Sequence, residues 1–193
     1  MNYPIQPIIL SIPAIIYIIV LKRKGQSYNT AFKNLGLTIP KAKYLLWAFV
    51  LGIFSIGVAY SIQKWISPGV LQNKSTASNF YSSWHLGIGT VLLAFCRELV
   101  YTTFGEEIFF RGFLGRVLFT RFGFRIGNLI QAAIFLAPHL FLLSISTAFA
   151  PTLVFVAIMG WVIGWLRFRS NSIFPGLLLH TMANTFSAAF VMI

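Results

Sequence analysis

The sequence predicts an all-α fold: a polytopic bundle of about six transmembrane helices with one further segment on the membrane surface. Hydrophobic residues make up 58% of the 193-residue chain, charged residues make up only 9%, and the mean hydropathy is +0.81. These values lie outside the range of soluble globular domains. The apolar residues also gather in runs of nearly the length that a membrane span needs. We therefore expect a single membrane-embedded domain over residues 1–193.

The first apolar run covers residues 5–21 and ends at the basic residues 22–24. It is about seventeen residues long, near the lower limit for a transmembrane helix. Residues 27–43 mix Phe and Leu with several Lys residues. A mixed pattern of this kind is typical of a segment that lies on the membrane surface.

The second predicted span covers residues 44–62. Trp47 and Tyr60 lie near its two ends, where aromatic rings prefer the boundary between lipid and water. Residues 63–83 that follow are polar and contain Pro, Gly, Ser and Asn. They predict an exposed loop.

The third run is compatible with a helix from about residue 86 to residue 118, too long to be embedded over its whole length. It contains Arg97 and Glu98, which do not face each other at adjacent helix positions. We interpret them as a structural link to another helix. Cys96 lies in the same run and is the only cysteine, so no internal disulfide exists and we expect it to serve as a small packing residue.

Three further spans are predicted at residues 129–148, 151–166 and 173–193. In the middle one, Gly160 and Gly164 form a G-x-x-x-G pattern, which allows close approach of a neighbouring helix. No internal repeat is visible in the sequence, which argues against the transporters that are built from repeats.

The basic residues predict the orientation of the bundle. Nearly all of them lie in the loops after the first, third and fifth spans, and such loops face the cytoplasm under the positive-inside rule. The chain is then a multi-pass protein of the cell membrane with both termini outside. The net charge of +12 does not indicate a nucleic-acid partner, because the basic residues form no continuous binding surface.

Two of the three acidic residues in the chain, Glu106 and Glu107, stand side by side at the end of a long apolar run. An ionisable side chain in such a place is costly and is functional by default. Glu107 and Arg111 are four positions apart with the acid first, the better order for an ion pair on a helix. Glu106 points about 100° away from that pair. The pattern predicts a structural ion pair beside an available general base.

His139 and His180 both lie within apolar runs. Asn184 shares one helix face with His180, because the two are four residues apart. With a rise of about 1.5 Å per residue, Glu106, His139 and His180 lie about 10 to 15 Å from the cytoplasmic ends of their spans. The three side chains are therefore able to meet at one level.

This set of groups supports two related mechanisms. Glu106, His139 and His180 have the composition of a zinc site with two histidines and one carboxylate, open to a water molecule. Without metal, Glu106 can act as a general base on water while His139, His180 or Asn184 stabilises the oxyanion. The residues alone leave both mechanisms open.

The motifs resemble the CAAX protease and bacteriocin-processing family of intramembrane proteases, also called CPBP or Abi. The family pattern is Glu-Glu-x-x-x-Arg, Phe-x-x-x-His and His-x-x-x-Asn/Asp on successive helices. Here the three motifs are residues 106–111, 135–139 and 180–184. The core that carries the resemblance covers about residues 95–188.

The resemblance implies hydrolysis of a peptide bond inside the membrane by a metallo- or glutamate-type endopeptidase. Glu106 would be the catalytic base, beside Glu107, while His139, His180 and Asn184 would bind a divalent metal, zinc above all, or stabilise the oxyanion. It also implies a membrane protein or peptide as substrate, for example a CAAX-box protein, as in type II CAAX prenyl endopeptidases, or a bacteriocin.

Two other functions are compatible with the sequence. The first is a non-catalytic membrane protein that binds a partner, such as a bacteriocin self-immunity factor. The second is a small ion or proton transporter, because buried Glu and His side chains also build proton relays. Replacing Glu106 by Gln distinguishes an enzyme from a binding protein, because only the enzyme requires the carboxylate.

Overall fold

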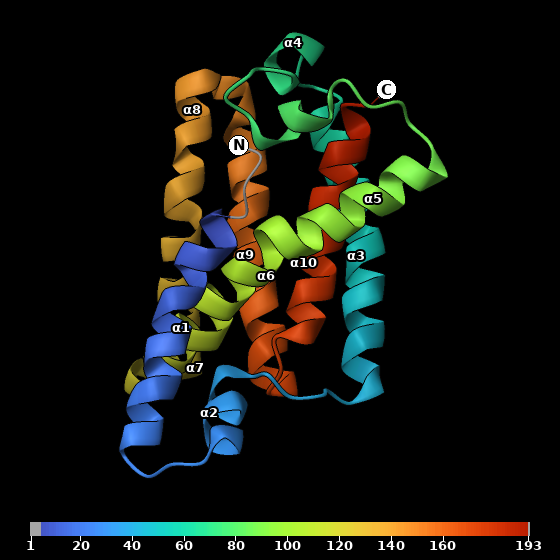
Figure 1. Ribbon diagram of the computed structural model, residues 1–193. Coiled ribbons are helices and arrows are strands. Elements are labelled where there is room, and N and C mark those ends of the chain that lie inside the picture. Colours follow the sequence, from blue (N-terminus) through green and yellow to red (C-terminus); the bar gives the residue numbers. More distant parts are fainter. Residues whose placement is uncertain (1–4, 193) are drawn as a thin grey trace.

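The computed structural model describes residues 5–192, and every regular element among them is helical. The longer apolar runs all form helices (Figure 1). The α-helices are α1 (Ile5–Arg23), α2 (Tyr28–Leu35), α3 (Ala42–Gln63), α4 (Pro68–Leu71), α5 (Ile88–Glu98), α6 (Phe104–Glu107), α7 (Gly115–Leu136), α8 (Leu142–Ile145), α9 (Ala150–Ser170) and α10 (Phe174–Phe190). Two π-helical segments are η2 (Leu99–Thr103) and η3 (Ile108–Leu114), and three 3₁₀ segments are η1 (Ala77–Tyr81), η4 (Ala137–Phe141) and η5 (Thr147–Phe149).

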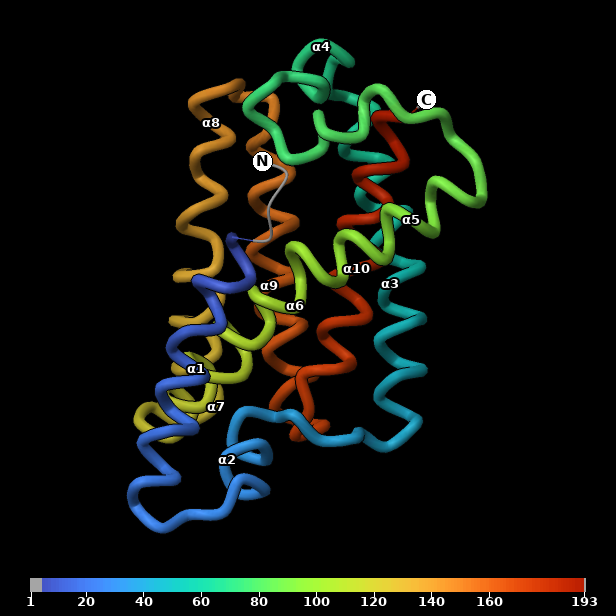
Figure 2. The backbone as a smooth tube through the Cα atoms, in the orientation of Figure 1, coloured from blue at the N-terminus to red at the C-terminus, as the bar shows by residue number. Residues whose placement is uncertain are grey.

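The long helices run side by side, with α2 at one end of the bundle and α4 at the other (Figures 1 and 2). Four helical stretches in the described part of the chain are long and apolar enough to cross a membrane: Ile5–Arg23, Ala42–Gln63, Ile88–Ile145 and Thr147–Ser170. The predicted class, an all-helical membrane bundle, is confirmed.

The stretch Ile88–Ile145 is not one straight helix. Gly123 has a φ of 69° inside α7 and breaks the helix there, a backbone conformation that favours glycine. A Cβ on Gly127 would lie only 2.7 Å from the carbonyl oxygen of Leu118, so the two arms of the break lie against each other. The chain therefore forms a hairpin between the regions predicted as the third and fourth spans. The sixth predicted span corresponds to α10, which has 17 residues and lies at the lower limit for a span; Ile193 lies outside the described residues.

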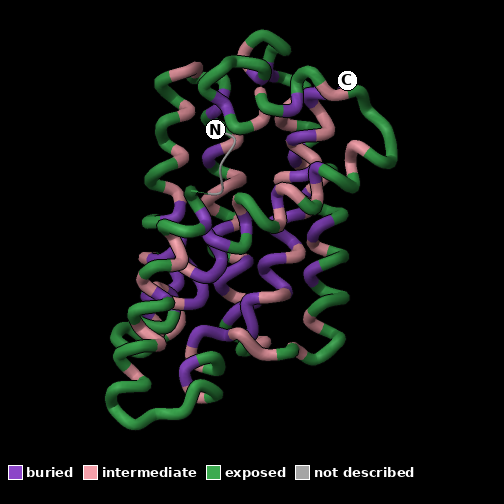
Figure 3. Tube along the Cα trace, in the orientation of Figure 1, coloured by how far each residue is buried: buried purple, intermediate pink, exposed green. Residues whose placement is uncertain are grey.

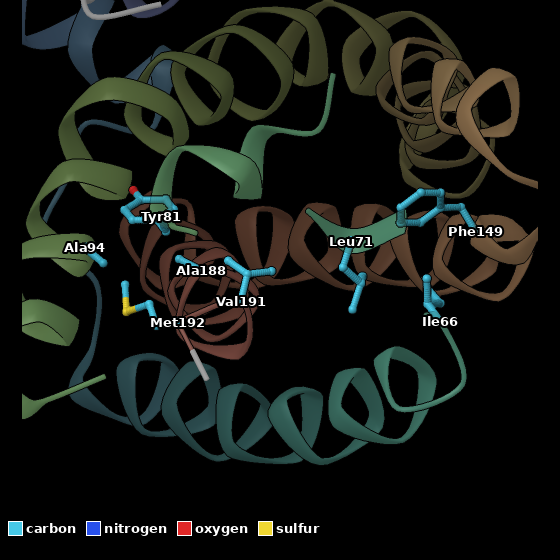
Figure 4. Packing of buried hydrophobic residues seen from close by; sticks show 8 residues of the cluster. All are labelled: Ile66, Leu71, Tyr81, Ala94, Phe149, Ala188, Val191 and Met192. Atoms are coloured by element: carbon cyan, nitrogen blue, oxygen red, sulfur yellow. The ribbon is translucent and has the colours of Figure 1, made fainter. Parts of the chain in front are cut away.

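Residues 63–83 are not the simple exposed loop that the sequence predicted. They contain α4 and η1, and Ile66, Leu71 and Tyr81 are buried. These side chains pack against Phe149 and the C-terminal end of α10 (Figure 4). The prediction failed because a few apolar residues, widely spaced in a polar segment, are enough to pack the segment against the end of the bundle. We call residues 63–83 the cap.

Part of the predicted surface segment, residues 27–43, forms α2 at the opposite end of the bundle (Figure 1). Ser27 caps the start of α2 by accepting a hydrogen bond from the Thr30 amide at 3.1 Å, the usual role of a serine at this position. Gly36 ends the helix with a φ of 75°. Leu35 is buried in a cluster with Ala14, Ile108 and Ile173, so the segment is anchored to the bundle.

Small residues bring the helices together. A Cβ on Gly52 of α3 would lie 2.6 Å from the Met182 side chain of α10, and one on Gly160 of α9 would lie 3.2 Å from Phe135 of α7. A Cβ on Gly164 would lie closer still to its neighbour, the Asn128 side chain of α7. The close contact predicted from Gly160 and Gly164 is confirmed, because a larger residue at either position would push α9 away from α7.

The outer face of the bundle is exposed and apolar, while the buried residues lie where the helices meet (Figure 3). Exposed apolar side chains such as Phe54 and Leu92 suit contact with the hydrocarbon chains of lipids. Cys96 also lies on this outer face. The expectation that it packs inside the bundle was wrong, because the sequence does not show which side of its helix faces the lipid.

Candidate active site

The paired glutamates lie on a short α-helical turn between two π-helical segments. α6 contains Glu106 and Glu107, η2 precedes it and η3 follows it. π-Helical turns inside a helix are rare and occur frequently at functional sites. Gly105 lets α1 approach this turn closely, because a Cβ there would collide with the Cα of Pro7.

Glu107 and Arg111 form the predicted ion pair. Arg111 Nη1 donates to Glu107 Oε1 at 2.9 Å, and both side chains are fully buried. Nη2 of Arg111 also donates to the carbonyl of Gly160 at 3.4 Å, and the guanidinium lies 4.2 Å from the ring centre of Phe135. This pair ties α6 and η3 to α7 and α9, and removing either partner would leave an uncompensated buried charge.

His180 connects the two glutamates. Its Nδ1 lies 2.9 Å from Glu107 Oε1, and its Nε2 lies 3.7 Å from Glu106 Oε2. The Glu107 carboxylate paired with Arg111 is an acceptor only, so Nδ1 of His180 carries a proton and donates. Gly176 allows this approach of α10, because a Cβ there would lie 3.1 Å from Glu107 Oε2. We name Glu106, Glu107, Arg111 and His180 the Glu106 cluster.

The sequence predicted that Glu106 has no partner, but in the structure its carboxylate accepts a hydrogen bond. Gln6 of α1 donates from Nε2 to Glu106 Oε1 at 2.7 Å, across 100 residues of sequence. Gln6 was not among the predicted site residues, although it is a polar residue within an apolar run. The signal was weak because nothing in the sequence places Pro7 and its neighbour Gln6 against Gly105. The side chain of Glu106 is 12% exposed and that of His180 is 8% exposed. The space between them is therefore not fully closed to water.

His139 lies in the same region but does not contact the glutamates by a hydrogen bond. Its Nδ1 lies 2.9 Å from the carbonyl of Phe135, four residues earlier, and must donate because a carbonyl only accepts. The Phe135 ring packs against both imidazoles, with centroid distances of 4.9 Å to His139 and 5.6 Å to His180. Phe135 therefore lies beside both histidines.

The structure does not assemble Glu106, His139 and His180 as a metal site: within residues 5–192, no three His, Cys, Asp or Glu side chains converge as a metal ion would require. Nδ1 of His180 is used for Glu107, and Nδ1 of His139 is used for the Phe135 carbonyl. The Nε2 atom of each imidazole is therefore the one that would bind a metal, as is usual when the other ring nitrogen donates. The metal set stays a prediction.

Asn184 lies one helical turn beyond His180 but contacts a different carboxylate. Its Nδ2 donates to Glu98 Oε2 at 3.2 Å, while the hydroxyl of Tyr81 donates to Glu98 Oε1 at 2.6 Å. Arg97 donates to the Tyr81 oxygen at 3.1 Å and lies 3.5 Å from Glu98. We name Tyr81, Arg97, Glu98 and Asn184 the Glu98 cluster. The predicted link from Glu98 to another helix is confirmed, and the contact with Arg97, which the sequence did not predict, is weak at this distance.

Burial and the neighbouring Glu98 carboxylate raise the pKa of the Tyr81 hydroxyl above its ordinary value. Tyr81 therefore keeps its proton and acts as a donor to Glu98. Because Tyr81 belongs to η1, this bond also fastens the cap over the bundle to α5.

A cavity of about 830 Å³ lies beside the Glu98 cluster and reaches Gln6, the hydrogen-bond partner of Glu106. Gln6 of α1 and Glu98 of α5 both line it, as do Lys74 and Asn79 of the capping segment. This segment lies at the end of the bundle that carries α4, away from the basic residues near α2 (Figure 1). The sequence predicts that the active site opens towards the cytoplasmic side, and this orientation stays a prediction.

The fold and this polar centre define an integral membrane protein with a buried acid–imidazole site. Residues 87–186 match the family described as Type II CAAX prenyl endopeptidase Rce1-like. The match covers just over half of the chain and includes all three motifs, so the chain belongs to this family. The resemblance stated from the motifs is thereby confirmed.

No curated protein and no solved structure matches the chain. Gln6 and Tyr81 lie outside the residues matched by the family. Both clusters are therefore completed by parts of the chain that the family match does not cover.

Proposed function

We propose that this protein is an intramembrane endopeptidase in which Glu106 activates water for attack on a peptide bond. The observation that supports this most directly is the placement of the Glu106 carboxylate. Gln6 fixes one oxygen, and the other faces Nε2 of His180 at 3.7 Å. That separation is longer than a direct hydrogen bond, so Glu106 Oε2 is available to a water molecule and His180 Nε2 to the carbonyl oxygen of the substrate.

The proposed mechanism uses His180 with a proton on each ring nitrogen. Glu106 and Glu107 contribute two negative charges and Arg111 one positive charge, so a protonated imidazole makes the cluster neutral. Neutrality matters because an uncompensated charge in a buried site is costly. In this state Nδ1 of His180 donates to Glu107, and Nε2 presents a second proton towards the carbonyl oxygen of the substrate.

In the proposed reaction Glu106 Oε2 accepts a proton from water as the oxygen attacks the carbonyl carbon. The carbonyl oxygen becomes an oxyanion, which the Nε2 proton of His180 stabilises. The bond from carbon to nitrogen then breaks, and the proton held by Glu106 passes to the leaving amine. The first products are a carboxylic acid and an amine, and Glu106 returns to its ionised form. The acid then loses its proton to the amine, which leaves a carboxylate and an ammonium group.

The remaining motif residues act around this centre. Glu107 and Arg111 hold the His180 ring in place, which makes them positioning residues. His139 and Asn184 are proposed to bind the substrate carbonyl from the other side. Asn184 can do so while bound to Glu98, because a side-chain amide has two N–H groups and Glu98 takes one.

The proposed substrate is a membrane protein or peptide, in keeping with the family description. Trimming of a CAAX-box protein and processing of a peptide such as a bacteriocin are the two substrate classes that we consider. We also propose that the basic end of the bundle is cytoplasmic, following the positive-inside rule. A cysteine at Ser75, in a Cys96→Ser background, should then react with an impermeant thiol reagent only from outside the cell.

The decisive experiment compares wild-type protein with Glu106→Gln in proteoliposomes. Farnesylated CAAX peptides and a membrane peptide fraction serve as substrates, and products are identified by mass spectrometry. We expect the variant to lose about a thousandfold in rate, the middle of the usual range for loss of a general base. Glu98→Gln is the matched control, because it makes the same chemical change on the same broken helix.

An unchanged cellular phenotype with Glu106→Gln would favour the alternative function, a non-catalytic binding protein such as a self-immunity factor. Cleavage by wild type that persists undiminished in Glu106→Gln would contradict the role of Glu106. Circular dichroism and thermal unfolding of both variants establish that each remains folded.

A further inference from the structure

A second cavity, of about 610 Å³, lies at the basic end of the bundle. Three basic residues from three different elements line it: Lys33 of α2, Arg116 of α7 and Arg167 of α9. None of the three acidic residues of the chain is among the lining residues, because Glu98, Glu106 and Glu107 belong to the two clusters described above. The cavity therefore concentrates positive charge without a carboxylate to balance it.

Arg167 is the most confined of the three cations, with 7% of its surface exposed. Its Nη2 donates to the backbone carbonyl of Asn34 at 2.9 Å, but within residues 5–192 its buried Nε has no hydrogen-bond partner. Gly36 makes room for the guanidinium, because a Cβ there would lie 2.5 Å from Nε. A buried arginine with neither a carboxylate nor a full set of acceptors is unfavourable unless an anion joins it.

The walls of the cavity are held by hydrogen bonds between distant segments. The Ile173 amide donates to the Gly36 carbonyl at 2.9 Å, Ser172 Oγ donates to the Thr38 carbonyl at 2.6 Å, and Thr38 Oγ1 donates to the Asn171 carbonyl at 2.8 Å. These bonds fasten the segment after α2 to the turn between α9 and α10. A cavity with walls fixed in this way is largely formed before a ligand arrives.

The lining also has an apolar side. Phe119 and Phe168 line the cavity together and pack edge to face with a centroid distance of 6.0 Å. Thr38, Thr120 and Asn171 supply neutral polar groups beside the cations. Cations, polar groups and aromatic rings in one pocket at the end of transmembrane helices suit a ligand with a phosphate group and a hydrocarbon part.

We infer that the cavity lined by Lys33, Arg116 and Arg167 binds the phosphate headgroup of an anionic phospholipid. The phosphate supplies the negative charge and the acceptors that Arg167 lacks, and the aromatic rings contact the glycerol and the acyl chains. A free phosphate ion shares the headgroup chemistry but leaves the aromatic side of the cavity unused. This site is separate from the Glu106 cluster and does not depend on the proposed protease activity.

Native mass spectrometry of the detergent-purified full chain, titrated with phosphatidylglycerol or phosphatidylcholine, tests the inference. We expect wild type to bind phosphatidylglycerol more tightly than phosphatidylcholine. The double variant Lys33→Gln/Arg116→Gln should bind phosphatidylglycerol about thirtyfold more weakly, five- to sixfold for each charge lost. Arg167 is left unchanged because its substitution endangers folding.

The matched control is Lys24→Gln/Arg125→Gln, which removes one lysine and one arginine that are exposed at the same end but do not line the cavity. We expect its affinity for phosphatidylglycerol to stay within twofold of wild type. Equal weakening in both double variants would overturn the inference, because it would indicate diffuse attraction to the whole basic end. Equal affinity of wild type for both lipids would overturn it as well.

Inorganic phosphate provides the remaining arm of the test. If inorganic phosphate displaces phosphatidylglycerol at comparable concentrations, the site is one for a free phosphate and the lipid assignment is wrong. We expect no displacement, because inorganic phosphate makes no contact with Phe119 and Phe168.

Discussion

The Glu106 cluster and the Glu98 cluster are neighbours on one broken helix, yet they have opposite character. Both oxygens of Glu98 are taken by neutral donors, Tyr81 and Asn184, with distances of 2.6 and 3.2 Å. Glu106 has one oxygen bound by Gln6, while the other faces the imidazole of His180 without a direct bond. The difference lies in how completely each carboxylate is satisfied.

This comparison shows how a structural carboxylate can be distinguished from a reactive one in a membrane protein. A carboxylate with a donor bound at each oxygen has less capacity left for a proton or a substrate. One that is held in place on one side and open on the other can accept a proton without moving. On this criterion Glu98 fastens the fold and Glu106 performs the chemistry.

The largest expected effect is on the free energy of unfolding, and it differs between the arginines of the two clusters. Arg111→Met removes a fully buried cation from its partner Glu107 and should lower the free energy of unfolding by about 3 to 5 kcal/mol. Arg97→Met mainly removes a guanidinium stacked 3.8 Å from the ring centre of Phe80 and should lower it by about 1 kcal/mol. Unfolding in mixed micelles measures both, and equal losses would contradict the distinction.

The next effect concerns Gln6, which orients the Glu106 carboxylate from outside the family-matched region. Gln6→Met keeps the size of the side chain but removes the donor, and should lower kcat by about 10- to 100-fold, the usual range for a group that orients a catalytic residue. KM should change little, because the proposed substrate contacts lie elsewhere.

Gln63→Met is the control for that experiment. Gln63 also joins a span to α10, through a bond of 2.9 Å to Ser187, but it is not part of either cluster. If the two substitutions lower kcat equally, Gln6 supports only the helix packing.

A smaller effect is expected for Tyr81→Phe, which breaks the 2.6 Å hydrogen bond to Glu98. The free energy of unfolding should fall by about 1 to 2 kcal/mol, while kcat stays within threefold of wild type. Because the folded-state pKa of Tyr81 is raised, its contribution is present below the unfolded pKa of about 10 and is lost only as the pH rises further. The loss in the variant should therefore be the same at neutral pH and at about pH 9, measured by thermal unfolding.

The smallest effect is expected from metal removal. With only Glu106 and His180 facing each other, a chelator should change kcat by less than twofold, and the purified protein should hold no stoichiometric zinc. Loss of activity with a chelator, restored by zinc, would show that His139 joins Glu106 and His180 as a ligand when substrate binds. Metal analysis by mass spectrometry accompanies the assay.

Local features could be predicted from the sequence because they depend on short separations along one helix. The ion pair of Glu107 and Arg111 follows from a spacing of four residues. The close contact at Gly160 and Gly164 follows from a similar spacing, although its partner helix does not. In both cases the period of the helix fixes which side chains share a face.

Contacts between distant segments could not be predicted in the same way. Asn184 was expected beside Glu106 because it shares a face with His180, but one turn along α10 carries it to Glu98 instead. Counting residues from the ends of the spans placed Glu106 and His180 at one level of the membrane. In the structure His180 Nε2 lies 3.7 Å from Glu106 Oε2, in agreement with that count. Depth alone does not fix rotation about the helix axis, and this rotation decides which groups touch.

The sequence by itself determined that this chain is an all-helical membrane protein with a buried acid pair and three ordered motifs, because hydropathy and helical spacing are local properties. Only the tertiary structure decided that Gln6 holds Glu106, that Tyr81 holds Glu98, and that Arg167 lines a cavity without a counter-charge. Each of these depends on the close approach of helices at glycine or on the folding of a cap over the bundle. Such approach depends on the packing of the whole bundle, which no single segment encodes.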